Sequence, residues 1–406
     1  MKRRSIPLAV TAHTATAAAG AGRGALLQAL RDGRSGLRPC RFAPFGEVHA
    51  VDTWTGDIDG LEAPLPEPWQ AFDCRNNRLA YAAIRRDGVL DAARAAVDRH
   101  GAWRVAVVAG TSTSGLLEAE GAYRRAVDGR LPQSFRYDKT LNVQSLAELL
   151  AALTGARGPA YAVSTACSSG SKVFAAAERL VAGGLADAVL VAGVDSQCLT
   201  TLHGFRSLEL LSPRPCRPFD RDRDGISLGE GAGFALLERR EAAPGAAIVL
   251  AGSGESSDAH HMSAPHPEGL GAELAMRDAL DAAGLEPGDI GYVNLHGTAS
   301  RANDLAEGLA VHRVFGDAVP SSSTKGWTGH ALGAAGMLEA VIAMLALEHD
   351  FLPGTLNLAD PDPACRARVL TEGVERRVDR VLSNSFGFGG TNSSLVFARA
   401  DVAAGR

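Results

Sequence analysis

Cys167 lies in the segment best suited to nucleophilic chemistry, Tyr161-Ala-Val-Ser-Thr-Ala-Cys-Ser-Ser-Gly170. The pattern predicts a strand, a tight turn of small residues and then a helix. A cysteine at such a turn lies at the positive end of the helix dipole, beside unpaired backbone N–H groups. That environment lowers the pKa of a thiol from about 8.5 and favours the thiolate. A buried structural cysteine is the alternative, and the local pattern alone leaves both open.

Two histidines stand in loops of the same kind. His296 lies where a predicted strand gives way to a glycine turn, in Asn294-Leu-His-Gly-Thr-Ala-Ser300. His330 ends the segment Ser321-Ser-Ser-Thr-Lys-Gly-Trp-Thr-Gly-His330, just before small residues open another helix. A lone histidine is more often a hydrogen-bonded structural group. Two of them, each in a strand-to-helix loop of small residues, are harder to explain as structural groups alone.

Further charged residues accompany the histidines. Lys325 precedes His330 by five residues, and it is one of only four lysines among 41 basic residues. We attribute the preference for arginine to coding bias, so a retained lysine at this position indicates a specific role. Asp304 and Glu307 follow His296 at the start of a predicted helix and add two carboxylates to that junction.

A fourth loop, Ser383-Asn-Ser-Phe-Gly-Phe-Gly-Gly-Thr-Asn392, is rich in glycine. Glycine permits positive φ and close approach of the backbone, so this loop is suited to donating N–H groups to a developing oxyanion. A phosphate-binding loop is the rival interpretation, but the Gly-Lys-Ser/Thr ending is missing. A dinucleotide-binding fingerprint is missing as well.

The composition is that of a soluble globular protein. The 406 residues are 46% hydrophobic and 21% charged, which excludes extensive disorder. The 41 basic and 46 acidic residues give a net charge of −5 without a basic stripe, so no nucleic-acid partner is expected. No apolar run reaches the roughly 18 to 20 residues of a membrane span. Met337–Leu347 comes nearest, and Glu339 interrupts it.

The six cysteines give no sign of a metal site or a disulfide framework, because no two stand two or three residues apart. The N-terminal stretch is similar to an export signal, but Thr11, His13, Thr14 and Thr16 interrupt its apolar part. We therefore expect a first strand at Ile6–Val10, no bound metal and a cytoplasmic protein.

Short apolar runs that end in glycine-rich loops alternate with helical stretches. Strands are predicted at Arg104–Ala109, Ala188–Val194, Gly233–Leu237, Ile248–Ala251, Tyr292–Leu295, Val381–Leu382 and Leu395–Phe397. Helices are predicted near Ala25–Arg31 and at Leu141–Leu153, Val173–Val181, Leu274–Ala283 and Leu338–Leu347. The alternation predicts an α/β protein with buried, largely parallel sheets. Arg239–Ala247 is the best candidate for a junction between two halves.

Together these segments resemble the β-ketoacyl-acyl-carrier-protein synthases, the elongating condensing enzymes of the thiolase-like superfamily. Further family motifs are Gly33–Gly36, Gly110–Gly115, Arg217–Asp220, Arg223–Gly233 and Gly387–Asn392. The resemblance implies an α/β fold of five layers, α/β/α/β/α, made of two similar halves. The N-terminal half, residues 1–247, would carry the nucleophilic cysteine, and the C-terminal half, residues 248–406, the two catalytic histidines.

The resemblance also implies an activity and a catalytic set, Cys167, His296 and His330. The cysteine would take an acyl group as a thioester, and the histidines would hold the carbonyl of a malonyl thioester during its decarboxylation. Backbone N–H groups of Cys167 and Phe388 would form the oxyanion hole. The substrates would arrive on the phosphopantetheine arm of acyl carrier protein, with no permanently bound cofactor.

Supporting residues follow from the same resemblance. Lys325 would pair with Glu339 and fix the electrostatic field around His330, a task for a compact ammonium rather than a guanidinium. Asp304 and Glu307 would form a buried acidic cluster with a structural or electrostatic role.

Three more positions match substrate-binding residues of the family. Thr298 and Ser300 correspond to residues that contact the phosphopantetheine arm, although the family often has threonine at the second position. Phe388 corresponds to the phenylalanine that gates the passage between the acyl pocket and the malonyl site.

The resemblance implies acyl carrier protein as a partner and either a homodimer or a heterodimer with a chain-length-factor-like homologue. Gly254–Pro267 and Asn294–Ala299 are most similar to the ketosynthases of bacterial aryl polyene pigment pathways. A fatty-acid elongation enzyme is the nearest alternative. A non-catalytic chain-length factor would lack the cysteine. Thiolases usually have a second cysteine near the C-terminus, where this chain has Phe386 and Phe388, and initiating synthases pair the cysteine with His and Asn.

Overall fold

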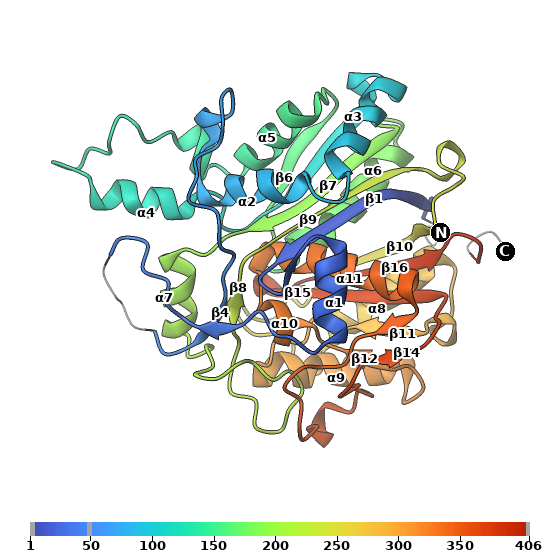
Figure 1. Cartoon of the computed structure of the whole chain (residues 1–406). Helices are drawn as coiled ribbons and strands as arrows, with labels where there is room; N and C mark the ends of the chain where they lie inside the picture. Colours follow the sequence, from blue (N-terminus) through green and yellow to red (C-terminus); the bar gives the residue numbers. More distant parts are fainter. Residues whose placement is uncertain (1–4, 47–50, 403–406) are drawn as a thin grey trace.

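A large mixed sheet forms the frame of the molecule (Figure 1). The computed structural model describes residues 5–46 and 51–402; residues 1–4, 47–50 and 403–406 of the two predicted halves lie outside the described residues. Within that part of the chain, the sheet has eleven strands. Ten of them join in the order β12-β11-β15-β16-β10-β1-β9-β7-β5-β6, and the eleventh, β2 (Gly20–Ala21), pairs with β1.

The strands on this path are β1 (Leu8–Ala17), β5 (Val105–Gly110), β6 (Ala160–Val163), β7 (Ala188–Asp195), β9 (Gly231–Arg239), β10 (Ile248–Ser257), β11 (Tyr292–Asn294), β12 (Ser321–Ser322), β15 (Arg380–Gly387) and β16 (Thr391–Arg399). The main helices are α1 (Arg23–Arg31), α2 (Arg75–Ile84), α3 (Val89–His100), α4 (Leu116–Arg124), α5 (Gln144–Thr154), α6 (Ser169–Ala182), α7 (Leu199–Ser207), α8 (Leu270–Ala283), α9 (Arg301–Phe315), α10 (Lys325–Thr328) and α11 (Ala335–His349).

The sheet contains the same five-strand topology twice. From the centre outward, the first half runs β1, β9, β7, β5, β6, and the second runs β10, β16, β15, β11, β12. Numbered along the chain within each half, both orders are first, fifth, fourth, second and third strand. The two innermost strands, β1 and β10, pair with each other and join the halves. The chain passes from one repeat to the other between Arg239 and Ile248, at the predicted junction.

The prediction of largely parallel sheets is wrong. Parallel pairs lie at the outer ends of the sheet, β5 with β6 and β7, and β11 with β12 and β15. The central pairs are antiparallel. In the second half the reason lies in how the chain returns from the fourth to the fifth strand. The short turn η8 (Phe388–Gly390) joins β15 to β16 as a hairpin, and such a return forces antiparallel pairing.

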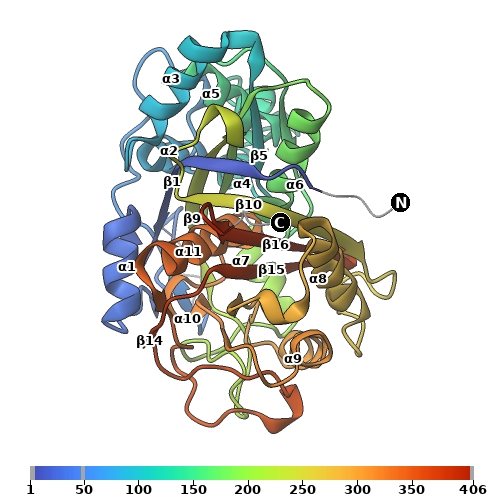
Figure 2. The ribbon, with the colours of Figure 1, turned by 90° about the vertical axis from the view of Figure 1, so that its right-hand side faces the viewer.

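Three hydrophobic clusters demonstrate five layers, because alternate residues of one strand face opposite sides of a sheet. In β5, Val105 and Val107 pack with the outer helices α2, α3 and α5, whereas Ala106 and Val108 pack with the inner helices. In the second half, Val293 packs with α8 and α9, and its neighbour Tyr292 with the inner cluster. Figure 2 shows α2, α3 and α5 in the upper part of the view and α8 and α9 in the lower part, and the inner helices α6 and α11 pack on each other.

The two inner helices position the reactive loops at their N-termini. Every residue of α11 from Ala335 to Leu347 is buried, and α11 packs directly on α6. By length and composition alone the stretch Leu332–His349 would suffice to cross a membrane. Since 89% of it is buried inside the structure, it has the surroundings of a core helix.

The predicted helices and strands agree with the structure in kind, and their ends differ by a few residues. The largest difference is β1, which runs from Leu8 to Ala17 rather than ending at Val10. His13, Thr14 and Thr16 are buried along it, and all three pair with residues of β9.

Candidate active site

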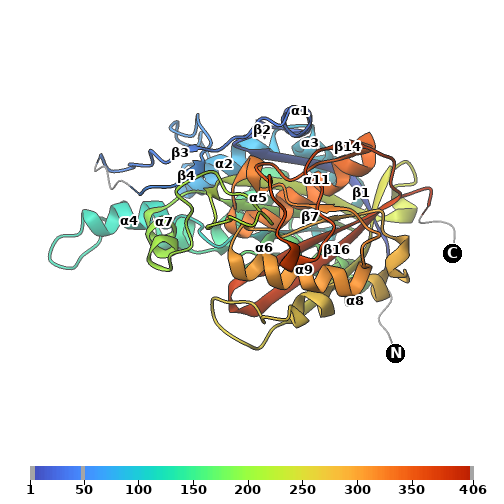
Figure 3. The ribbon, with the colours of Figure 1, turned by 90° about the horizontal axis from the view of Figure 1, so that it is seen from below.

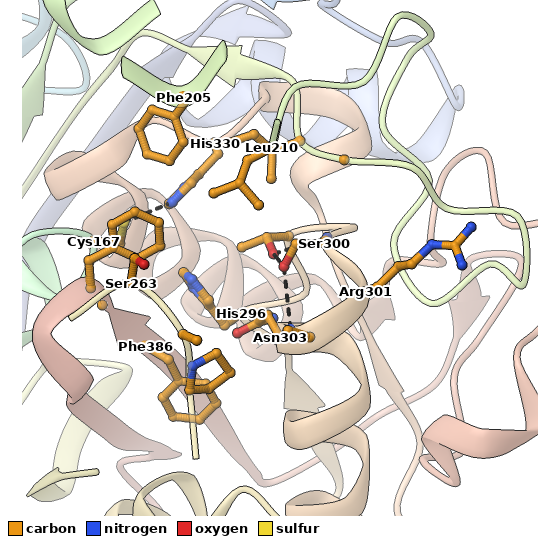
Figure 4. A pocket seen from close by; sticks show the side chains of 18 of the residues that line it. Cys167, Phe205, Leu210, Ser263, His296, Ser300, Arg301, Asn303, His330 and Phe386 are labelled. Atoms are coloured by element: carbon orange, nitrogen blue, oxygen red, sulfur yellow. Dashed lines mark hydrogen bonds between the residues drawn. The ribbon is translucent and has the colours of Figure 1, made fainter. Parts of the chain in front are cut away.

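Cys167 lies at the turn between β6 and α6, as the sequence predicts. Its neighbour Ala166 has φ 49°, a left-handed conformation that is uncommon for a residue other than glycine. The thiol is 6% exposed and faces a cavity of about 370 Å³ (Figure 4). Residues that line this cavity include Cys167, Phe205, Leu210, Ile226, Thr298, Ser300, Arg301, Phe386, Phe388, Asn392 and both candidate histidines.

The structure brings the three predicted catalytic residues together. His330 Nε2 lies 3.0 Å from Cys167 Sγ. The His296 ring is 5.3 Å from the His330 ring, centroid to centroid, and almost perpendicular to it at 83°. His330 is held by its backbone N–H, which donates to the carbonyl of Ser227 at 2.7 Å. In Figure 4 the three side chains border one space, although two of them come from the second half.

Both histidines are neutral in this environment. Burial lowers the pKa of His296 and of His330 well below the ordinary value near 6.5, and the positive charge of Lys325 acts in the same direction. A neutral imidazole has one N–H donor and one lone pair. His330 is therefore able to accept the thiol proton, and His296 to donate a hydrogen bond to a substrate.

The predicted low pKa of Cys167 is wrong for this state of the enzyme. Burial raises the pKa of the thiol to about 12, against the lowering effects of Lys325 and of the backbone N–H of Phe388. The helix N-terminus is present, but the thiol is almost completely removed from water, and desolvation of a thiolate costs more than the dipole returns. A thiol, hydrogen-bonded to His330, is the resting form.

Lys325 and Glu339 form the predicted ion pair, and both side chains are buried. The ammonium also donates to the carbonyl of His296 and lies 3.4 Å from His296 Nδ1. Because an ammonium only donates, it favours the His296 tautomer with the proton on Nε2. The lysine thus contacts His296 directly, and its charge also lowers the pKa of His330. Burial raises the pKa of Glu339 to about 7.

Glu307 and Asp304 are buried on α9, behind the His296 loop. Glu307 accepts hydrogen bonds from the backbone N–H groups of His296 and Gly297 at 2.8 and 2.7 Å. Asp304 accepts from the N–H groups of Phe219 and Ala299 at 2.8 and 3.2 Å. Burial raises the pKa of both carboxyls, that of Glu307 to about 7. They hold the loop's backbone and do not line the cavity.

Thr298 and Ser300 lie on the cavity wall. Their hydroxyls are 3.0 Å apart, and Ser300 Oγ also accepts from the N–H of Asn303 at 3.3 Å. Ser300 is therefore the N-cap of α9. One face of this pair thus starts the helix while the other is open to a substrate.

Phe388 lies in η8 at the entrance to β16. Its ring packs 5.6 Å from that of Phe205, centroid to centroid. At the preceding Gly387, a Cβ would lie 3.0 Å from the carbonyl oxygen of Thr165 and 3.2 Å from the nitrogen of Cys167. Glycine at this position lets the loop approach the nucleophile turn closely, which brings the N–H of Phe388 to the thiol.

Sequence reasoning missed several residues around this centre. Phe205 lines the cavity from α7, which belongs to the first half of the chain, as Cys167 does. Asp195 ends β7 and accepts from four residues, including the N–H of Gly333 at 2.6 Å. Asn384 donates to Glu307 at 3.2 Å. Its place inside the glycine-rich loop was a usable signal; the other two have none, because their partners are distant in sequence.

The described residues, 5–46 and 51–402, contain no cluster of three or more His, Cys, Asp or Glu side chains suited to a metal ion.

Comparison with protein families identifies the chain. The beta-ketoacyl synthase N-terminal domain family matches residues 6–243, and the beta-ketoacyl synthase C-terminal domain family matches residues 247–359. A thiol hydrogen-bonded to one neutral histidine, with a second histidine on the same cavity, agrees with that class. The chain belongs to the β-ketoacyl synthase family, and it is an acyl-transferring condensing enzyme with the thiolase-like fold.

Individual relatives agree. The chain is 35% identical to 3-oxoacyl-[acyl-carrier-protein] synthase 2 of Synechocystis sp., over 92% of this chain and 93% of that protein. It is 34% identical to nodulation protein E of Rhizobium sp., over 91% and 93%. Among solved structures, it is similar to the complex of a ketosynthase with its chain length factor from Xenorhabdus doucetiae, with TM-score 0.86, 38% identity and coverage of 97% and 98%.

Proposed function

We propose that this enzyme elongates acyl chains by decarboxylative Claisen condensation on Cys167. The observation that carries the proposal is the 3.0 Å contact between Cys167 Sγ and His330 Nε2, with His296 on the same cavity. In this proposal residues 1–247 supply the nucleophile and residues 248–406 supply both histidines.

The first step loads the enzyme. The Cys167 sulfur attacks the carbonyl carbon of an acyl thioester while His330 Nε2 takes the thiol proton. The carbon–sulfur bond of the donor breaks, and the departing thiolate recovers that proton. Proton transfer during attack answers the raised pKa of Cys167, because no free thiolate has to accumulate in the buried site. The N–H groups of Cys167 and Phe388 would bind the tetrahedral oxyanion.

The second step forms the carbon–carbon bond. His296 donates a hydrogen bond to the carbonyl oxygen of a malonyl thioester, and so does His330 once its neutral ring carries the proton on Nε2 instead of Nδ1. The thioester loses carbon dioxide and becomes an enolate. Its α-carbon attacks the acyl carbon on Cys167, and the bond to sulfur breaks. The product is a β-ketoacyl thioester, and the cysteine thiolate takes a proton from solvent. The Lys325 contact favours the donor form of His296 that this step needs.

We propose that the substrates arrive on the phosphopantetheine arm of acyl carrier protein, in the cytoplasm, and that the arm passes Thr298 and Ser300. Chains similar to this one occur in ketosynthase–chain length factor complexes. We therefore propose a heterodimer with such a homologue, with a homodimer as the alternative. The similarity of Gly254–Pro267 to aryl polyene ketosynthases, together with the aromatic residues Phe205, Phe386 and Phe388 on the cavity, favours conjugated or aryl acyl chains.

The test is mass spectrometry of carrier-bound products. The full chain is incubated with malonyl-carrier protein and a panel of saturated, unsaturated and aryl acyl primers. We expect products two carbons longer than the primer, and none with Cys167→Ala. Cys40→Ala is the matched control, because Cys40 is half-buried and outside the cavity lining.

Elongation by Cys167→Ala would refute the nucleophile assignment. Absence of condensation by the unaltered chain, alone and with its partner homologue, would instead favour a non-catalytic chain-length-factor role. Carbon dioxide release from malonyl-carrier protein by Cys167→Ala shows that the variant is folded, because both histidines remain.

A further inference from the structure

Helix α7 forms one wall of the active-site cavity. It carries Phe205, whose ring packs against that of Phe388 directly beside the nucleophile. The residues after the helix, Glu209 and Leu210, continue the same wall. Figure 4 shows Phe205 and Leu210 on the side of the cavity that also holds His330. A displacement of α7 would therefore change the shape of the space open to an acyl chain.

Most residues of this helix are not fully buried. Of its nine residues, Leu202 is the one that is fully buried. Within the described part of the chain, its N-cap residue Cys198 caps no backbone N–H with its side chain; Cys198 Sγ lies 3.2 Å from Thr201 Oγ1. Burial of apolar surface is the main source of helix stability in proteins, so the position of α7 depends on its remaining contacts.

One carboxylate on another helix replaces the missing cap. Glu120 of α4 accepts from the backbone N–H of Leu199 at 3.0 Å and from that of Thr200 at 2.7 Å. These are the first two N–H groups of α7, and a carboxylate there also interacts favourably with the helix dipole. Helices α4 and α7 lie side by side in both views (Figures 1 and 3).

We propose that Glu120 is a positioning residue that sets the acyl-chain selectivity of the enzyme by holding α7, and with it Phe205, against Phe388. This inference rests on the proposed function. Glu120 does not line the cavity and touches no reacting atom. It acts through the helix: without the carboxylate the first turn of α7 frays, the Phe205 ring leaves its contact and the cavity admits bulkier chains.

The helix α4 also provides a matched control. Glu118, two residues earlier, accepts from the backbone N–H of Arg75 at 2.8 Å and so caps α2. Among the described residues that line the cavity, none comes from α2. Glu120→Gln and Glu118→Gln therefore remove the same charge from the same helix, and only the first changes a helix at the cavity.

The experiment measures acylation of Cys167 by dodecanoyl and butyryl thioesters, as the ratio of the two kcat/KM values. A ratio is independent of the fraction of enzyme that folds. For Glu120→Gln we expect the ratio to rise about fivefold, the size of effect that loss of a helix cap typically has on a local equilibrium. For Glu118→Gln it stays at the value of the unaltered chain. An unchanged ratio in Glu120→Gln overturns the proposal.

A double-mutant cycle tests the route through Phe205. Phe205→Leu should raise the same ratio, and adding Glu120→Gln to it should produce little further change. Independent, multiplying effects would overturn the proposed route. Hydrogen exchange gives a readout without substrate: Glu120→Gln should speed exchange in residues 199–207, and Glu118→Gln in residues 75–78. If the unaltered chain is not acylated at all, the proposed function fails, whereas the exchange result still judges the positioning of α7.

Discussion

The two halves of the molecule use the same strand order to do different work. The loop after the second strand of the second half carries His296 and is held from behind by Glu307. The equivalent loop of the first half, after β5, carries only small hydroxyl residues. Thr111, Ser112 and Thr113 all donate to the carboxylate of Asp195 at the end of β7. The His296 loop lines the cavity, whereas the Thr111 loop binds the buried side chain of Asp195.

The buried anion nevertheless serves the reactive half. Asp195 also accepts the N–H of Gly333, three residues after His330, at 2.6 Å. A Cβ at Gly333 would lie 2.6 Å from that carboxylate oxygen, so glycine is required for the approach. The carboxylate is fully buried and obtains its stability from these donors. The first half thus helps to position His330, a residue of the second half.

The largest expected effect is that of His330→Ala, which removes the chemistry from the second half. Decarboxylation of malonyl-carrier protein should fall by roughly 10²- to 10⁴-fold, since the variant loses a positioned imidazole. Carbon dioxide release measures it. His349→Ala, an exposed histidine at the end of the same inner helix, serves as the control. Unchanged carbon dioxide release in His330→Ala would show that His330 takes no part in decarboxylation.

Asp195→Asn breaks the comparison from the other side. An amide in place of the carboxylate turns an NH₂ group toward buried donors and leaves at least one unsatisfied, at a cost of about 1–3 kcal/mol. We expect decarboxylation per folded molecule to fall by about ten- to hundredfold, because weakening the hydrogen bond from Gly333 leaves the His330 loop less firmly held. The folded fraction is measured separately by denaturant unfolding. A variant that is less stable but equally active per folded molecule would mean that Asp195 serves the first half alone.

The sequence predicted Cys167, His296 and His330 as the catalytic set, and the structure places all three on one cavity. Each lies in a local pattern that it shares with the family. Cys167, His296 and His330 all follow strands and precede helices. Contacts between segments that are distant in sequence were not predicted, because nothing near Asp195 or Glu120 indicates that they contact Gly333 or α7.

The wrong predictions have the same origin. The pKa of Cys167 depends on burial. Burial results from the packing of both halves and cannot be inferred from the residues next to Cys167 in the sequence. The antiparallel centre of the sheet follows from the return between the fourth and fifth strands. The glycine-rich sequence 387–390 was interpreted as a catalytic loop, although it is also a hairpin turn between β15 and β16.

The pKa of the Cys167 thiol depends on both halves of the molecule. Burial raises it, while Lys325 and the Phe388 N–H of the second half lower it. With a pKa near 12 the thiolate fraction keeps growing through the accessible range. Alkylation by iodoacetamide should therefore accelerate about tenfold for each pH unit between pH 7 and 10, with no plateau. Mass spectrometry of the Cys167 peptide follows the rate. A plateau near or below pH 8.5 would mean that the second half outweighs burial.

The smallest expected effect concerns how the two equivalent loops end. The His296 loop runs into α9 through the N-cap Ser300, whereas the Thr111 loop runs into α4 through Gly115, for which the described structure shows no side-chain cap. Ser300→Ala should lower the free energy of unfolding by about 1 kcal/mol, because the N–H of Asn303 loses its acceptor. Denaturant unfolding measures this difference.

The reciprocal change, Gly115→Ser, offers α4 the same kind of cap but should still destabilise the protein. A Cβ at Gly115 would lie 2.5 Å from the backbone carbonyl oxygen of Thr140, so backbone has to shift before the new hydroxyl can reach an N–H group. If Gly115→Ser instead stabilises the chain, the two loops differ by a missing cap alone. If it destabilises, the first-half loop is fixed by close packing against residues 137–141, and the absence of a cap there is a consequence of that packing.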